Sequence, residues 1–99
     1  MNDFDLSPAS RQDLLDLWEY IAQDDVNAAD RVRDALFEAM SNLAAMPGTG
    51  HRRDDQTDEP LRFWSVHRYL IIYRPDTHPL EIVRVVSGYR DVTALLKNE

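Results

Sequence analysis

The chain has 99 residues, no cysteine and a formal net charge of −7 at pH 7. We expect one domain, residues 1–99, with one hydrophobic core. The lack of cysteine excludes disulfides and thiolate metal sites. A charge of −7 argues against tight non-specific binding to DNA or RNA, because such binding depends on neutralising phosphates with Lys and Arg.

The N-terminal sequence MNDFD lacks the basic start and the apolar run of a signal peptide. The chain holds no stretch near the roughly 20 apolar residues that a membrane span needs. We therefore expect a cytoplasmic protein that does not interact with membranes.

The net negative charge of the chain comes entirely from its first half. Residues 1–50 hold ten acids and three arginines, whereas residues 51–99 are neutral overall. The second half, which holds most of the arginines, is therefore where a local basic cleft would form.

The start of the chain predicts a short strand followed by an amphipathic helix. Phe4 and Leu6 alternate with acidic residues, which is typical of a strand with one apolar face. Ser7 followed by Pro8 is a common start of a helix. Apolar side chains then recur at three- and four-residue spacing, so we expect one helix from Pro8 to Gln23.

A second amphipathic helix is expected to follow. Asn27 is its predicted N-cap residue. An apolar stripe runs from Ala28 to Leu43, and Pro47 and Gly48 then end the helix. Two helices joined by such a short connection predict an antiparallel hairpin whose apolar stripe is core.

Three runs of β-branched and aromatic residues predict strands at Leu61–Val66, Tyr69–Tyr73 and Leu80–Val86. We expect an antiparallel meander whose middle strand is largely covered on both faces. The preceding segment, His51–Pro60, is charged and rich in turn formers, which indicates a solvated connector. Since a small sheet is not stable alone, the hairpin should pack on it, and the predicted fold class is α+β.

No motif for catalysis, metal binding or cofactor binding is present. The three histidines, His51, His67 and His78, have no metal-ligand spacing. The glycine-rich phosphate-binding patterns and the nucleophile-elbow pattern are also missing from the sequence. We therefore expect no cofactor, no metal ion and no catalytic residues.

Arg84 stands out because it lies inside an otherwise apolar strand. Alternation places it on the same face as Ile82 and Val86. A guanidinium group there must either pair with a carboxylate of the protein or face a groove that a partner fills. For the first alternative, the expected acid is Asp91 or an acid of the first strand. Both alternatives stay open.

Two more arginines flank the predicted strands. Arg68 precedes the middle strand, and Arg90 follows the last strand after Gly88 and Tyr89. A curved sheet would bring both to the same concave side as Arg84. A protein partner with carboxylates would meet complementary charge on that side.

Five segments in the predicted order carry a family resemblance. They read Phe4-x-Leu6-Ser7-Pro8-Ala9, Asp13-Leu14-x-x-Leu17-Trp18-x-Tyr20-Ile21-Ala22, Leu43-Ala44-x-x-Pro47-x-x-Gly50, Tyr69-Leu70-Ile71-Ile72-Tyr73 and Arg84-Val85-Val86-Ser87-Gly88-Tyr89-Arg90-Asp91. Over about residues 4 to 96, the chain resembles the ParE/RelE superfamily of bacterial toxins from type II toxin–antitoxin systems. The resemblance implies one curved sheet in which the first strand joins the meander.

The resemblance implies one of two activities. RelE-like members cut messenger RNA on the ribosome with basic residues and often a tyrosine near the C-terminus, whereas ParE-like members poison DNA gyrase without a nuclease site. Arg90 stands where a RelE-type arginine would, but Leu96 or its neighbours occupy the place of the late tyrosine, and Lys97 is the only lysine. The shortage of charge-stabilising and proton-transferring groups favours the ParE-like branch.

As a ParE-like toxin, the chain would be a non-enzymatic gyrase inhibitor. The resemblance implies neutralisation by a cognate ParD-like antitoxin and a role in plasmid stabilisation. The expected partner-binding residues are Arg68, Arg84, Tyr89, Arg90 and Asp91. Nucleic acid would be bound only through the antitoxin complex. A ribosome-dependent nuclease and a non-toxic antitoxin-binding member are the alternatives.

Overall fold

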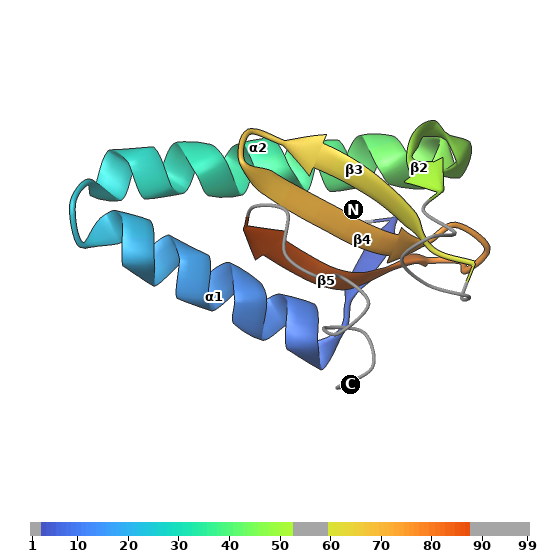
Figure 1. Ribbon diagram of the computed structural model, residues 1–99, viewed down its shortest axis with the longest axis horizontal. Helices are drawn as coiled ribbons and strands as arrows, with labels where there is room; N and C mark the ends of the chain where they lie inside the picture. Colours follow the sequence, from blue (N-terminus) through green and yellow to red (C-terminus); the bar gives the residue numbers. More distant parts are fainter. Residues whose placement is uncertain (1–2, 53–59, 88–99) are drawn as a thin grey trace.

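The computed structural model describes residues 3–52 and 60–87. In this part of the chain, a helical hairpin lies on one face of a five-stranded sheet (Figure 1). The elements in chain order are β1 (Phe4–Leu6), α1 (Pro8–Ala22), α2 (Val26–Ala45), the 3-10 helix η1 (Pro47–Thr49), β2 (His51–Arg52), β3 (Arg62–Val66), β4 (Tyr69–Arg74) and β5 (Leu80–Ser87). This is the α+β architecture that the sequence predicts.

The strands are ordered β1-β5-β4-β3-β2 across the sheet. β3, β4 and β5 pair antiparallel, and β1 joins the sheet parallel to β5. Both features confirm the expected meander and its connection to the first strand. The prediction that His51–Pro60 is a solvated connector is wrong at its start, because His51 and Arg52 form β2 and pair with Phe63 and Arg62. The sequence of β2 has no apolar alternation, so tertiary contacts and not local pattern form this strand.

The two helix starts differ in how well the sequence predicts them. Ser7 is the N-cap of α1, and its Oγ accepts a hydrogen bond from the N–H of Ser10 at 3.0 Å, as predicted. The N-cap of α2 is Asp25 and not the predicted Asn27, and the Asp25 carboxylate accepts the N–H of Ala28 at 3.1 Å. Asp and Asn are both favoured cap residues, so composition alone does not choose between them.

The main core lies between the hairpin and the sheet. Leu36 and Met40 of α2 meet Ile71, Tyr73 and Ile82 of the sheet, and all five are fully buried. The predicted assignment of the α2 stripe to the core is therefore confirmed. Burial of this apolar surface is the main force that holds the hairpin on the sheet.

The opposite face of the sheet carries a second apolar cluster. Its members are Leu61, Phe63, Leu70, Ile72, Val83 and Val86. Each is at most 7% exposed, and none belongs to a described helix. Because β4 contributes to both clusters, its sequence is a continuous apolar run instead of an alternating one. The expectation that the middle strand is covered on both faces is confirmed.

A register shift in the β4–β5 pairing changes which way Arg84 faces. Ile72 pairs with Arg84, but the next residue, Tyr73, pairs with Ile82, so Val83 is an extra residue on β5. Paired residues share a face, which puts Arg84 on the side of Ile72 and opposite Ile82. The predicted common face of Arg84 and Ile82 is therefore wrong, because strict alternation does not hold across a bulge.

The hydroxyl of Tyr73 bonds the segment that follows α2, Pro47–Gly50, to the sheet. It donates to the Pro47 carbonyl at 2.6 Å and accepts the N–H of Gly50 at 2.8 Å. Arg62 Nη1 donates to the Gly50 carbonyl at 2.7 Å. We call these four residues the Tyr73 cluster. Burial raises the pKa of Tyr73, although the hydrogen bond from Gly50 and the charge of Arg62 oppose the rise.

Candidate functional site

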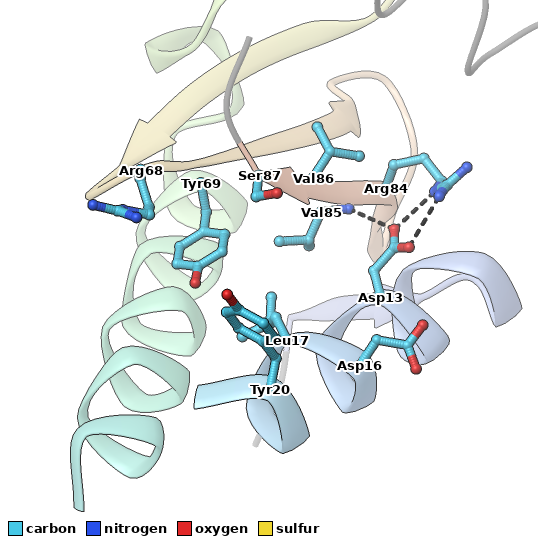
Figure 2. Close-up of a pocket in the computed structure, with 10 residues that line it drawn as sticks. All are labelled: Asp13, Asp16, Leu17, Tyr20, Arg68, Tyr69, Arg84, Val85, Val86 and Ser87. Atoms are coloured by element: carbon cyan, nitrogen blue, oxygen red, sulfur yellow. Dashed lines mark hydrogen bonds and ion pairs between the residues drawn. The ribbon is translucent and has the colours of Figure 1, made fainter. Parts of the chain in front are cut away.

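Arg84 forms a two-point ion pair with Asp13 of α1. Arg84 Nε lies 2.7 Å from Asp13 Oδ2, and Arg84 Nη2 lies 2.9 Å from Asp13 Oδ1 (Figure 2). The side chains are only 19% and 14% exposed. The backbone N–H of Val85 also donates to Asp13 Oδ2, at 3.0 Å. We call these three residues the Asp13 cluster.

For Arg84, the Asp13 cluster shows an internal ion pair, which is one of the two alternatives that the sequence left open. Arg84 does have an internal carboxylate partner, but this acid comes from α1 and not from the first strand. Asp91, the other expected acid, lies outside the described residues. No sequence pattern singles out Asp13, because it belongs to the acidic side of an amphipathic helix, where a solvated carboxylate is the ordinary expectation.

Asp13 reaches β5 because β1 is short. β1 pairs with β5 only as far as Ile82, after which the chain turns into α1. Ser7 at this turn donates from its N–H to the Ile82 carbonyl at 3.1 Å and from its Oγ to the Val83 carbonyl at 2.8 Å. Asp13 then takes the N–H of Val85. The start of α1 thus satisfies polar groups of β5 that lie beyond its pairing with β1, the neighbouring strand in the described part of the chain.

A groove of about 550 Å³ lies between α1 and the end of the sheet, next to the Asp13 cluster. We call it the α1–β5 groove. Its walls are formed by Asp13, Asp16, Leu17, Tyr20, Arg68, Tyr69, Arg84, Val85, Val86 and Ser87 (Figure 2). Tyr69 is buried, whereas Tyr20 is 74% exposed. The groove therefore presents a large aromatic side chain to solvent beside a buried apolar wall.

Arg68 reaches the groove from the turn between β3 and β4. Val66 pairs with Tyr69, so His67 and Arg68 form a two-residue hairpin loop. His67 has a φ of 56°, in the left-handed region. Both loop side chains are exposed. The hairpin thus carries a cation to the rim of the groove, while Asp16 supplies an exposed carboxylate from α1.

The structure brings together only part of the predicted site. Arg68 and Arg84 both line the α1–β5 groove, but the charge of Arg84 is balanced by Asp13. The other three predicted residues, Tyr89, Arg90 and Asp91, lie outside the described residues. Sequence reasoning missed Tyr20 as a site residue, although Tyr20 is part of one motif that carries the family resemblance.

The α1–β5 groove combines apolar, hydroxyl and charged side chains. In residues 3–52 and 60–87, no three His, Cys, Asp or Glu side chains gather as metal ligands. The histidines have other positions: His51 stacks on Trp64 at a ring-centre distance of 6.1 Å, and His67 is in the hairpin loop. None of the described helices is both long enough and apolar enough to cross a membrane.

Comparisons with known proteins agree with this architecture. The family described as "ParE toxin of type II toxin-antitoxin system, parDE" matches residues 4–92. The chain is also similar to a solved structure of the chromosomal ParDE TA system from P. aeruginosa, with a TM-score of 0.72 and 14% sequence identity over 90% of this chain and 98% of that chain. At this identity, the structural match shows a shared fold. No curated protein matches the sequence. Because the family match spans most of its length, the chain belongs to the ParE toxin family of type II toxin–antitoxin systems.

Proposed function

We propose that this chain is a toxin that acts by binding protein partners and not by catalysis. A cognate ParD-like antitoxin would occupy the α1–β5 groove and neutralise it, and DNA gyrase would be the target. The observation that supports this antitoxin site is the groove, which is lined by the exposed Tyr20 and the buried Tyr69. Tyrosine and arginine are enriched among residues that dominate binding energy at protein interfaces.

The antitoxin site uses the predicted arginines in different ways. Arg68 is exposed and lines the groove, where a carboxylate of the antitoxin would reach it. Arg84 is already paired with Asp13, so its main role would be to hold α1 beside β5 and keep the groove open. Tyr89, Arg90 and Asp91 are proposed to extend the contact, because they directly follow Ser87 at the groove.

The proposal of gyrase as target is supported by family membership and by what the chain lacks for nuclease chemistry. The chain has a single lysine, Lys97, and Leu96 or its neighbours stand where RelE-like members often carry a tyrosine, so few groups are available to transfer protons during cleavage of a phosphodiester. A supercoiling assay with purified gyrase should show dose-dependent inhibition by this chain. The nuclease alternative would be supported if primer extension showed codon-phased cuts in messenger RNA after induction and the supercoiling assay showed no gyrase inhibition. Normal growth during induction would instead indicate a non-toxic antitoxin-binding member.

The proposed antitoxin site is tested by two substitutions with matched controls. Tyr20→Ala and Arg68→Glu should each weaken binding of the cognate antitoxin about tenfold or more, measured by calorimetry on the full chain. Glu19→Ala and Arg31→Glu change exposed residues that do not line the groove, so they should change the affinity less than about twofold. Equal effects of the site and control variants would contradict the proposed site.

A further inference from the structure

The pairing of β5 departs from ordinary alternation at one residue, and this departure decides where Arg84 faces. Val83 is the extra residue in the pairing of β5 with β4. Ile82 before it and Val85 after it both belong to the main core, whereas Arg84 lies between them on the other side of the sheet. Without the bulge, strict alternation would place Arg84 on the core face with Ile82. The bulge is therefore a condition for Arg84 to reach Asp13.

Ser7, at the turn from β1 into α1, bonds directly to the bulge. Its Oγ donates to the Val83 carbonyl at 2.8 Å, and its N–H donates to the carbonyl of the preceding residue at 3.1 Å. On the other side of Arg84, the N–H of Val85 donates to Asp13 at 3.0 Å (Figure 2). The start of α1 thus holds the backbone on both sides of Arg84, and Ser7 supplies the bonds on the side of the bulge.

The side chain of Ser7 is itself held in one position. Its Oγ accepts the N–H of Ser10 at 3.0 Å as the cap of α1, and its carbonyl accepts the Ser10 hydroxyl at 3.0 Å and the N–H of Arg11 at 2.9 Å. Ser10 is completely buried, which strengthens these bonds. For the single hydroxyl proton of Ser7, the Val83 carbonyl at 2.8 Å is a closer acceptor than Ser10 Oγ at 3.2 Å. The hydroxyl of Ser7 therefore donates to the bulge.

The two bonds of the Ser7 hydroxyl make different chemical demands. Capping α1 needs only an acceptor, which Asp supplies as well as Ser does. Asp25, the N-cap of α2, meets this demand with a carboxylate that accepts the N–H of Ala28. The bond to the Val83 carbonyl needs a donor, and an ionised carboxylate has none. A hydroxyl at position 7 therefore serves a purpose beyond helix capping.

We infer that Ser7 is a positioning residue for the α1–β5 groove: its hydroxyl bond to the bulge carbonyl turns Arg84 toward Asp13. The ion pair in turn holds α1 beside β5, and these two elements form walls of the groove. Ser7 does not line the groove, so its effect on binding passes through the bulge. The effect on binding rests on the proposed function, whereas the orientation of Arg84 does not.

Hydrogen exchange of the Arg84 Nε–H, followed by NMR on the full chain, tests this role. In the original chain this hydrogen lies between Arg84 Nε and Asp13 Oδ2, which are 2.7 Å apart, and it should exchange slowly. Ser7→Asp keeps an acceptor for the cap but loses the donor to Val83, so the exchange should be about tenfold faster. Ser7→Ala should act in the same direction. Ser7→Thr, which keeps the hydroxyl, should keep the slow rate.

Asp25→Ala is the matched control, because it removes the N-cap of the other helix, whose bond is to Ala28 of α2. In this variant the Arg84 Nε–H should exchange within about twofold of the original rate. The inference is overturned if Ser7→Asp exchanges at the original rate, or if Asp25→Ala speeds the exchange as much as the Ser7 variants do. If Ser7→Asp or Ser7→Ala does not fold, the other one decides by comparison with Ser7→Thr.

Antitoxin binding separates failure of this inference from failure of the proposed function. By calorimetry, Ser7→Asp should weaken binding of the cognate antitoxin about fivefold, and Ser7→Thr should stay within about twofold of the original. If Tyr20→Ala weakens binding and Ser7→Asp does not, Ser7 does not position the groove, and the inference is overturned while the proposed site stands. If the unchanged chain does not bind the antitoxin, the proposed function fails, and the exchange rate of Arg84 still decides whether Ser7 sets its orientation.

Discussion

Two clusters join the sheet to the helical half of the chain by different chemistry. The Tyr73 cluster joins the segment that follows α2, Pro47–Gly50, to β3 and β4 through hydrogen bonds of the Tyr73 hydroxyl and the Arg62 side chain with backbone groups. The Asp13 cluster joins α1 to β5 through a mostly buried ion pair. Only the Asp13 cluster borders the α1–β5 groove. The comparison suggests that the Tyr73 cluster serves stability alone, while the Asp13 cluster also shapes a binding surface.

The largest expected effect on stability comes from removing Asp13. Asp13→Ala leaves Arg84 without this carboxylate and the Val85 N–H without its acceptor. The free energy of unfolding should fall by about 3 kcal/mol, since the substitution removes a mostly buried ion pair and a hydrogen bond to the backbone together. Asp16→Ala, three residues later on the exposed side of α1, should change it by less than about 0.5 kcal/mol. Equal denaturation midpoints for the two variants would contradict the structural role of the ion pair.

Gly50, in the Tyr73 cluster, gives the next largest effect. A Cβ at this position would overlap the Tyr73 hydroxyl and ring, and hydrogen bonds to Pro47 and Gly50 hold that hydroxyl in place. Gly50→Ala should therefore destabilise the chain by about 2 kcal/mol. Gly48→Ala is the matched control, because a Cβ there meets nothing within 4 Å. If thermal unfolding shows the same change for both variants, Tyr73 is not packed against Gly50.

Removing the Tyr73 hydroxyl should cost somewhat less. Tyr73→Phe loses the bonds to Pro47 and Gly50, which should lower the free energy of unfolding by about 1–2 kcal/mol. The measurement is chemical denaturation at pH 7. Antitoxin affinity should stay within about twofold of the original, because Tyr73 does not line the α1–β5 groove. A large loss of affinity in a folded Tyr73→Phe variant would contradict the distinction between the two clusters.

The pKa of Tyr73 adds a dependence on pH with a defined sign. Burial raises the pKa of this hydroxyl in the folded chain above the value in the unfolded chain. Its contribution to stability is therefore complete below about pH 10 and is lost as the pH rises from there through the folded pKa. The difference in unfolding free energy between the original chain and Tyr73→Phe should shrink over this alkaline range. If this difference in unfolding free energy stayed constant as the pH rose above about 10, the raised pKa of Tyr73 would be contradicted.

The smallest expected effect is at the turn that carries Arg68. His67 has a φ of 56°, which glycine adopts at lower cost than a side chain with a Cβ. His67→Gly should raise the free energy of unfolding by about 0.5 kcal/mol. Binding of the antitoxin should be unchanged if only Arg68 of this loop contacts it. A loss of stability in the glycine variant would show that the His67 side chain makes a contact that offsets its backbone conformation.

Local sequence patterns predicted most of the fold. Helical periodicity, the Ser7–Pro8 start and three apolar runs gave both helices, the meander and the fold class. What they missed depends on contacts between distant residues. β2 forms through pairing with Arg62 and Phe63, and the bulge that turns Arg84 away from Ile82 exists only in the paired strands.

The site was less predictable than the fold, for the same physical reason. The sequence identified Arg84 as a charge that needs a partner, but Asp13 lies 71 positions away in the chain. No periodicity on α1 distinguishes this acid from Asp16 beside it. Likewise, nothing local marks Tyr20 as a groove residue, because its exposure next to Tyr69 results from how α1 lies against β5.

Hydrogen exchange of the full chain with and without its cognate antitoxin tests the central claim most directly. The account predicts that antitoxin binding slows amide exchange in α1 around Leu17–Tyr20 and at the end of β5, while Pro47–Gly50 in the Tyr73 cluster exchanges at an unchanged rate. Protection confined to the Tyr73 cluster, with α1 and β5 unaffected, would contradict the claim that the α1–β5 groove is the antitoxin site.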